Sequence, residues 1–278
     1  MSSARKVTLI TGCSSGIGLA TAVAFAQRGD AVVATMRHTA DADSLRAALD
    51  GARVTADMRA LDVADDNSVA GGIAAIISDY GQIDVVVSNA GIGCDGTTEQ
   101  STIADFRVLF ETNTLGAVRL LHAVLPGWRG RRAGRFISVG SLAGVVGQPF
   151  HDAYCASKFA VEGLLESMHP VVAQFGITVS IVEPGPVVSS FAGKLAAPNA
   201  RIDPGVYAAS RQRFHEQQAI SDTGAQSSAD IAEMIVRVAG ERRPVLRYQT
   251  SEMVQRLVGL KLNDMTGERI TTLTSRWV

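Results

Sequence analysis

Short runs of apolar residues alternate with longer amphipathic stretches along most of the chain. Several of these runs are continuously apolar, which is typical of parallel strands buried on both faces. The runs lie at Val7–Ile10, Ala31–Thr35, Met58–Val63, Asp84–Ser88, Gly134–Val139 and Thr178–Glu183. Helical stretches lie between them, near residues 16–28, 42–50, 66–80, 102–128 and 151–175. This alternation predicts an α/β fold, a doubly wound parallel sheet of about seven strands with helices on both faces.

The alternation breaks at about residues 189–228, where Pro and Gly residues occur among scattered large apolar side chains. We interpret this region as an insertion with short helices that lies over the sheet. A helix at 229–240, a seventh strand at Val245–Arg247 and a helix around 251–263 are expected to follow, the last in a C-terminal extension at about 248–278. Because no linker or repeat interrupts the chain, residues 1–278 are predicted to form a single domain.

Composition narrows the class of protein. Hydrophobic residues make up 46% of the chain and charged residues 19%, so a large core is available and general disorder is excluded. A net charge of -1 argues against nucleic acid or an anionic membrane as a partner. There is no apolar run long enough to predict a membrane span. Three cysteines at unrelated spacings predict no metal site and free thiols in a reducing, cytoplasmic compartment.

A glycine-rich segment, TGCSSGIG at residues 11–18, leads from the first strand into the first helix. Glycines allow a tight turn and let a diphosphate approach the backbone, while the helix N-terminus supplies oriented N–H groups. The alternative is an ordinary strand-to-helix turn, but the position after the first strand favours a Rossmann-type dinucleotide site. The residues expected to hold the diphosphate are Gly12, Ser14, Ser15, Gly16, Ile17 and Gly18.

Tyr154 and Lys158 are four residues apart in a helical stretch and therefore share one face. A phenol is a poor acid–base catalyst at neutral pH unless a nearby ammonium stabilises its anion. Ser141 follows the strand Gly134–Val139 at the carboxyl edge of the sheet, where its hydroxyl would hold the substrate oxygen while Tyr154 gives or takes a proton. Ser138 lies inside that strand and is interpreted as structural. An exposed lysine beside a half-buried tyrosine is the alternative.

These motifs, together with Asn89-Ala90-Gly91 after the fourth strand and Asn113 in NTLG, resemble the short-chain dehydrogenase/reductase family in order and spacing over essentially the whole chain. The resemblance implies a nicotinamide-dependent oxidoreductase. It also implies catalytic roles for Asn113, Ser141, Tyr154 and Lys158. Lys158 would reach the nicotinamide ribose, Asn113 would anchor a water that links Lys158 to solvent, and Asn89 would brace the central strand near the cofactor.

Further segments resemble the branch that contains type 1 17β-hydroxysteroid dehydrogenase and related retinol dehydrogenases. They are VVATMR at 32–37, YCASKFAVEGLLESM at 154–168, VEPGPV at 182–187 and VLRYQTSEMVQRL at 245–257. The shorter bacterial 3-oxoacyl reductases usually end before the last of these. Gln148, His151 and the insertion depart from the steroid enzyme, so the resemblance implies chemistry on carbonyls and alcohols more strongly than it implies a steroid or retinoid.

The resemblance also assigns cofactor contacts beyond the glycine-rich segment. Asp62, with Val63 beside it, matches the position that meets the adenine ring, although Asp62 is alternatively a helix cap. The segment at 184–187 would cover the nicotinamide face, and Ser189 matches a threonine that contacts the carboxamide. The further residues assigned to the cofactor are Asn89, Ala90, Gly91, Tyr154, Lys158, Pro184, Gly185 and Val187.

The end of the second strand indicates which nicotinamide cofactor is preferred. An acidic residue at this position selects NAD by accepting hydrogen bonds from the adenosine ribose. Here the position holds Met36, and Arg37 follows it. A guanidinium binds a 2′-phosphate well, so we expect NADP(H) to be preferred and NAD(H) to remain possible. The alternatives are that Arg37 is a solvated surface arginine and that Asp41, the next acid, caps the following helix.

Apolar residues near the site predict a hydrophobic secondary alcohol, ketone or aldehyde as substrate, of steroid, retinoid or lipid type. They are Val145, Val146 and Phe150, and in the insertion Phe191, Leu195, Val206, Tyr207, Phe214 and Ile220. Alternatively, the insertion residues close a small core of their own. His151 and His215 are interpreted as hydrogen-bonding or structural residues. A homodimer or homotetramer is expected from the family resemblance alone.

Three other functions compete with this reading. A redox-inactive nucleotide-binding regulator on the same scaffold typically lacks the Tyr or the Lys, and this chain keeps both. A 3-oxoacyl-type reductase shares the site but usually lacks the late segment. A methyltransferase with a related fold is disfavoured by the loop spacing and by the Ser, Tyr and Lys set.

Overall fold

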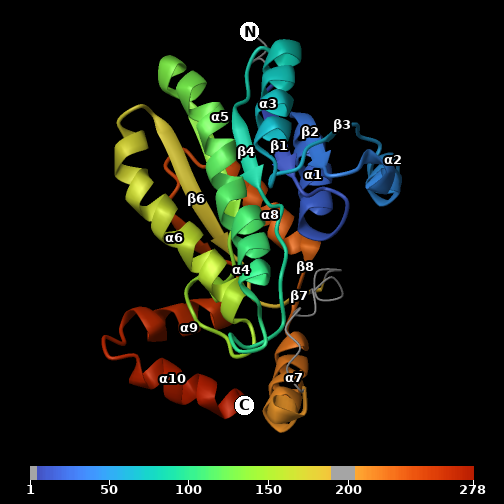
Figure 1. The fold of residues 1–278 in the computed structure, drawn as a ribbon. Coiled ribbons are helices and arrows are strands. Elements are labelled where there is room, and N and C mark those ends of the chain that lie inside the picture. The colour runs from blue at the N-terminus through green and yellow to red at the C-terminus, as the bar shows by residue number, and fades with distance from the viewer. Residues whose placement is uncertain (1–4, 189–203) are drawn as a thin grey trace.

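The computed structural model describes residues 5–188 and 204–278. A parallel sheet runs through the middle of this part of the chain, with the strand order β3-β2-β1-β4-β5-β6-β9 (Figure 1). Its strands are β1 (Val7–Thr11), β2 (Ala31–Met36), β3 (Asp57–Ala60), β4 (Val85–Ser88), β5 (Gly134–Val139), β6 (Ile177–Glu183) and β9 (Arg247–Gln249). The order reverses between β1 and β4, so the predicted doubly wound fold is confirmed.

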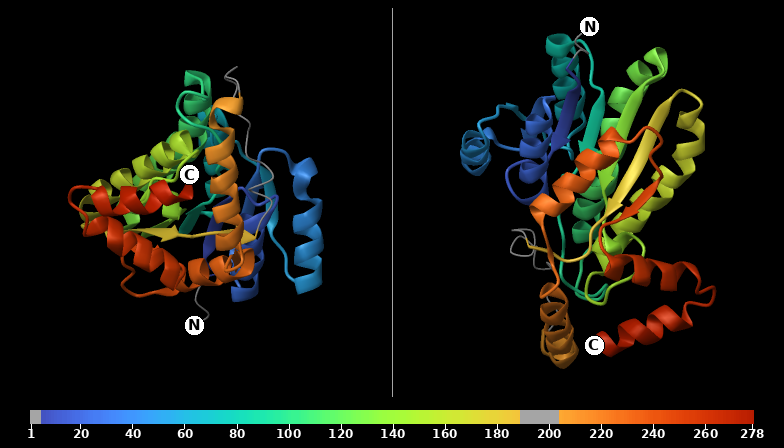
Figure 2. Two further views of the ribbon diagram at one scale, coloured as in Figure 1. Left: turned by 90° about the horizontal axis from the view of Figure 1, so that it is seen from below. Right: turned by 180° about the vertical axis from the view of Figure 1, so that it is seen from behind.

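Helices cover both faces of the sheet and bury two separate cores. The face turned away in Figure 1 carries α1 (Gly16–Arg28), α2 (Asp43–Ala52) and α8 (Ser228–Gly240), whose apolar side chains form one core (Figure 2). The other face carries α3 (Asp66–Tyr80), α5 (Gly116–Arg131) and α6 (Asp152–Ala173), which form the second core. Strands β1, β4 and β5 contribute side chains to both cores, which explains why their sequences are continuously apolar.

The remaining elements gather at the carboxyl edge of the sheet (Figure 1). They are the short strands β7 (Val187–Val188) and β8 (Gln226–Ser227) and the helices α4 (Ile103–Phe110), α7 (Ala208–Asp222), α9 (Glu252–Leu262) and α10 (Glu268–Thr274). Short helices were expected in the insertion, but α7 runs for 15 residues. Helices α9 and α10 form the C-terminal extension and pack on the segment after β5 through a small apolar cluster.

Two predicted strands differ from the observed strands by more than one residue at an end. The third was expected to reach Val63 but ends at Ala60, because the Asp62 carboxylate accepts a hydrogen bond from the N–H of Ala64 at 3.0 Å and turns the chain. The seventh was expected at Val245–Arg247 and instead spans Arg247–Gln249. The backbone groups of Val245 form hydrogen bonds with side chains: its N–H donates to the Tyr248 hydroxyl, and its carbonyl accepts from the Ser180 hydroxyl.

The helix predicted over 102–128 is interrupted. Helix α4 ends at Phe110, a π-helical turn follows at Glu111–Leu115, and α5 begins at Gly116. The chain is closely packed where the two helices join, since a Cβ on Gly116 would lie 3.0 Å from the side chain of Val63. Such wide turns are common at functional sites, and this one holds Asn113.

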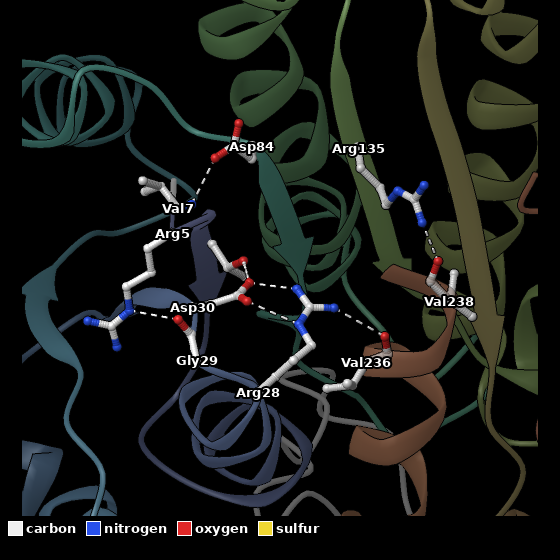
Figure 3. Close-up of polar contacts among 10 residues, drawn as sticks. Arg5, Val7, Arg28, Gly29, Asp30, Asp84, Arg135, Val236 and Val238 are labelled. Carbon is white, nitrogen blue, oxygen red and sulfur yellow. Dashed lines mark hydrogen bonds and ion pairs between the residues drawn. The ribbon is translucent and has the colours of Figure 1, made fainter. Parts of the chain in front are cut away.

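Arginines close the amino edge of the sheet (Figure 3). Arg28 pairs with Asp30 at 2.6 Å and donates to the carbonyl of Val236 near the end of α8. Arg135, on β5, donates to the carbonyl of Val238. Cations at a helix C-terminus satisfy orphaned carbonyls and oppose the negative end of the helix dipole. The amino edge is therefore closed by polar contacts, and the carboxyl edge carries the candidate site.

Candidate active site

The glycine-rich segment forms a cradle between β1 and α1. Gly12 and Gly16 adopt φ angles of +74° and +59°, a region that favours glycine. A Cβ on Gly12 would lie 2.9 Å from the Cα of Ala90, and one on Gly18 would lie 2.3 Å from the carbonyl oxygen of Gly12. Larger residues at these two positions would therefore collide with backbone.

Asn89 fixes the cradle to the end of the neighbouring strand. Its side-chain amide donates to the carbonyls of Thr11 and Gly12 at 2.9 and 3.2 Å. The Thr11 hydroxyl in turn accepts from the backbone N–H groups of Asn89 and Ala90, both at 3.1 Å. The bracing position expected for Asn89 is thus present, at the point where the strand order reverses.

The cradle fits the diphosphate of a dinucleotide. The first turn of α1 contains no acidic residue, so no side-chain carboxylate opposes the positive end of its dipole. Ser14, Ser15 and Ile17 are partly exposed at this end. Cys13 points inward instead, where its thiol is fully buried and donates to the Ile10 carbonyl at 3.3 Å.

Asn113 ties the segment after β4 to helix α6. Its side-chain oxygen accepts from the N–H of Ile92, and its amide donates to the carbonyl of Ile92 and to the Ser157 hydroxyl, all at 2.9 Å. A Cβ on Gly91 would lie 3.2 Å from Asn113 Oδ1 and 3.8 Å from Lys158 Nζ. Asn113 and Lys158 therefore approach Gly91 together. Ser157 was not predicted as a site residue, because its only signal in the sequence is its place beside Lys158.

Ser141 and Tyr154 meet at the carboxyl edge of the sheet. Ser141 begins a 3-10 turn at Leu142–Gly144 directly after β5, and Tyr154 lies in the first turn of α6. Burial raises the pKa of the Tyr154 phenol to about 12, and a hydrogen bond with Ser141 acts in the opposite direction. The phenol is therefore protonated at neutral pH and is in contact with the hydroxyl proposed to hold a substrate oxygen.

Lys158 lies one helical turn beyond Tyr154 and is 8% exposed. Its Nζ is 5.9 Å from the centroid of the Tyr154 ring and donates to the Val139 carbonyl at 2.9 Å. Burial lowers the pKa of the Lys158 ammonium to about 8, against the opposing effect of the Glu162 carboxylate. Asn113, Ser141, Tyr154 and Lys158 are thus all placed at one edge of the sheet.

The other residues expected near the nicotinamide lie beside this group. The Pro184 carbonyl accepts from the N–H of Leu142 at 2.8 Å, which joins the segment after β6 to the Ser141 turn. A Cβ on Gly185 would lie 2.8 Å from Val254 of α9. Val187 begins β7, and Ser189 lies outside the described residues.

The residues expected near the adenosine lie at the ends of β2 and β3. Asp62 forms a turn with Ala64 and is not the cap of α3, which is Asp65. Val63 is buried, and its carbonyl accepts a hydrogen bond from Arg119 at 3.3 Å. Arg37 is exposed just after β2, and no other side chain in the described ranges hydrogen-bonds to it.

Aromatic rings join α7 to the segment before Tyr154. Phe150 is buried with φ +62°, an uncommon conformation for a large side chain. Its ring centroid lies 5.6 Å from that of Phe214 and 6.4 Å from that of Tyr207. His151 lies 5.4 Å from Phe214 and 6.4 Å from the Tyr154 ring, again between centroids. An apolar wall therefore continues from α7 to the phenol.

Other residues predicted to form this wall are arranged differently. Val145 and Val146 are buried under α9 and α10. Val206 is 67% exposed, beside Tyr207. The side chains of Phe191, Leu195 and Ile220 lie outside the described part of the chain.

His151 and His215 each have a polar side chain beside the imidazole ring. Burial lowers the pKa of His151, and its Nδ1 lies 3.3 Å from Gln148 Oε1. His215 Nε2 lies 3.7 Å from the Asp95 carboxylate.

The model of the short chain dehydrogenase family matches residues 6–200. The chain is also 40% identical to human retinol dehydrogenase 8, over 99% of this chain and 91% of the relative. It is 36% identical to human 17-beta-hydroxysteroid dehydrogenase type 1, over 99% and 86% of the two chains. The protein therefore belongs to the short-chain dehydrogenase/reductase family, whose members are oxidoreductases that act on alcohols with NAD(P).

Solved structures agree with this assignment. A short-chain dehydrogenase from Streptomyces avermitilis matches with a TM-score of 0.80 and 32% identity, over 100% of this chain and 97% of the other. A family member from Burkholderia phymatum in complex with NAD matches with a TM-score of 0.82 and 25% identity, over 95% of both chains. A metagenomic oxidoreductase in complex with NADP matches with a TM-score of 0.70 and 26% identity, over 88% and 96%. Together they support a nicotinamide cofactor here.

The crowding around Gly18 predicts the result of adding a methyl group to the cradle. Gly18→Ala should weaken NADPH and NADH binding by about 5–100-fold, because overpacking costs about 1–3 kcal/mol. Fluorescence titration of the reduced cofactors measures this. Gly71→Ala, on an open part of α3, should bind as the wild type does. Equal affinities for all three proteins would show that the cradle does not hold the cofactor.

Proposed function

We propose that this protein is an NADP(H)-dependent oxidoreductase that interconverts a hydrophobic alcohol and its carbonyl compound, a secondary alcohol with its ketone or a primary alcohol with its aldehyde. The observation that carries the proposal is the convergence of Ser141, Tyr154 and Lys158 beside the glycine cradle, with the phenol and the ammonium on one face of α6. In this proposal residues 1–278 form one catalytic domain, and the region 189–228 covers the substrate.

Each side chain of the site has a defined role in the proposed reaction. The residues at 12, 14–18, 37, 62–63, 89–91, 184–185, 187 and 189 would hold the cofactor, which when bound supplies or accepts the hydride. The Ser141 hydroxyl holds the substrate oxygen. Tyr154 donates its phenol proton to that oxygen in reduction and removes it in oxidation. The Lys158 ammonium stabilises the resulting phenolate, which burial alone disfavours.

Asn113 would complete the route by which the proton is replaced. Its side chain lies with Lys158 Nζ around Gly91, and its three hydrogen bonds keep it fixed. A water held there would link the ammonium to solvent, so Tyr154 could recover its proton after each turnover. This role rests on the family resemblance and on the placement of the two side chains.

The aromatic wall supports an apolar substrate. Phe214 packs against both Phe150 and His151, and the His151 ring lies beside the Tyr154 ring. The relatives named as retinol and steroid dehydrogenases agree with this class.

We also propose a homodimer or homotetramer in the cytoplasm. Large apolar side chains are exposed on α4 and α6, at Ile103, Val108, Phe159 and Val171, which supports association of two copies. All three cysteines are free, as a reducing compartment allows. None of the helices in the described ranges is long and apolar enough to cross a membrane.

Removal of the phenol hydroxyl tests the catalytic assignment. Tyr154→Phe keeps the ring but has no transferable proton, so turnover of a hydrophobic ketone with NADPH should fall by about 10²–10⁴-fold. The loss is followed by absorbance at about 340 nm, where reduced nicotinamide absorbs. NADPH affinity, measured by fluorescence, should stay within a few-fold of the wild type. Near-normal turnover in this variant would contradict the mechanism.

The exposed arginine after β2 determines cofactor preference in this proposal. Wild-type protein should bind NADPH about 10–100-fold more tightly than NADH, as one ionic hydrogen-bonded contact of about 1.5–3 kcal/mol allows. Arg37→Ala should remove most of this preference and leave NADH kinetics nearly unchanged. Arg242→Ala, an exposed arginine after α8, is the matched control. A wild type that prefers NADH, or a loss of affinity for both cofactors in Arg37→Ala, would disprove the assignment.

A further inference from the structure

Four ionisable side chains form a row along one face of α6. Tyr154, Lys158, Glu162 and Glu166 are spaced four residues apart, so each lies about one turn beyond the previous one. The row begins at the phenol and ends at Glu166, whose side chain is 61% exposed. The mechanism above uses the first two members and leaves the two carboxylates unexplained.

Glu162 is buried behind the catalytic lysine and beneath the turn that carries Ser141. Its side chain is 8% exposed, and its Oε2 accepts from Arg247 Nε at 2.9 Å. Its other oxygen, Oε1, is buried and has no hydrogen-bond partner among the described residues. That oxygen would lie 3.5 Å from a Cβ on either Gly140 or Gly144, which flank the Ser141 turn. A carboxylate is thus held directly under the catalytic serine.

The charged groups that face Glu162 come from three elements. On α6 they are Lys158 and Glu166, on β6 Glu183, and on β9 Arg247. Glu183 is fully buried, 3.5 Å from Arg247 Nε, and its other oxygen accepts from Gln249 at 2.7 Å. Arg247 also pairs with Glu166. Three carboxylates therefore share one guanidinium, and Lys158 is the second cation near Glu162.

We propose that Glu162 is a positioning residue that keeps Lys158 in its ammonium form and so sets the upper pH limit of ketone reduction. The proposal rests on the proposed function, since it concerns the group that stabilises the Tyr154 phenolate. Glu162 acts through Lys158 and does not touch the substrate.

The direction of the effect follows from burial and charge. Burial lowers the pKa of Lys158 to about 8, and the negative charge of Glu162 opposes this change. The pKa of Glu162 is itself raised to about 7, by burial and by Glu183, so Glu162 is mostly ionised where Lys158 titrates. Loss of the carboxylate charge therefore lowers the pKa of Lys158 further. The ammonium is then lost at a lower pH, and the phenolate loses its stabilising charge.

The experiment compares the pH dependence of kcat and kcat/KM for ketone reduction with NADPH, from about pH 5.5 to about pH 10. Glu162→Gln keeps the shape but not the charge, and should move the alkaline limb to lower pH by about 0.5–1 unit. Glu166→Gln removes an exposed carboxylate that pairs with the same arginine, and should leave the profile in place. Glu162→Asp keeps the charge, so its alkaline limb should lie close to that of the wild type.

A second variant distinguishes loss of the Glu162 charge from disruption of the carboxylate cluster around Arg247. Glu183→Gln removes the like charge that opposes ionisation of Glu162, so its alkaline limb should stay at or above that of the wild type. This comparison decides the matter if Glu162→Gln does not fold, as judged by circular dichroism and NADPH titration. An unmoved limb in folded Glu162→Gln, or a limb lowered equally in Glu183→Gln, would overturn the proposal.

Failure of the proposed function gives a different result. A folded wild type without turnover of any hydrophobic ketone contradicts the oxidoreductase assignment. A wild type that turns over normally, together with an unmoved profile in Glu162→Gln, contradicts only the role of Glu162.

Discussion

A lysine ammonium buried beside a phenol is the interaction on which the rest of the site depends. Burial disfavours the charged form of both groups, raising the pKa of Tyr154 to about 12 and lowering that of Lys158 to about 8. The protein offsets this with oxygen atoms around the ammonium: the Val139 carbonyl and, one turn along α6, the Glu162 carboxylate. These contacts require α6, β5 and β9 to be held in a fixed arrangement, so the chemistry of the site depends on the packing of the sheet.

Two sets of hydrogen bonds connect the parts of the site at the point where the strand order reverses. Asn89 joins the end of β4 to the glycine cradle after β1, and Asn113 joins the next few residues to α6. The cofactor cradle and the Tyr154–Lys158 face are therefore connected through one short segment of chain, residues 89–92. At the other edge of the sheet, Arg28 and Arg135 secure the end of α8. Polar contacts thus hold the amino edge of the sheet, and the candidate site lies at its carboxyl edge.

The parts of the site that could be predicted from sequence follow local rules. The glycine spacing at 12–18 and the four-residue spacing of Tyr154 and Lys158 determine their geometry within one turn or one helix. The cluster around Glu162 joins α6 to strands about 20 and 85 residues away, a proximity that no local pattern contains. The π-helical turn at Asn113 depends on tertiary contacts of its side chain with Ile92 and Ser157. The exposure of Val206 could not be predicted either, because apolar character alone does not determine burial.

In the proposed function this site transfers a hydride between a nicotinamide and a carbonyl carbon while Tyr154 supplies the proton. Isotope transfer tests this most directly: the protein is given a hydrophobic ketone and NADPH that carries deuterium at the transferable position, and the alcohol is examined by mass spectrometry. We expect an alcohol with deuterium on its carbinol carbon. Alcohol formed without the label, or no alcohol from folded protein that binds NADPH, would contradict it.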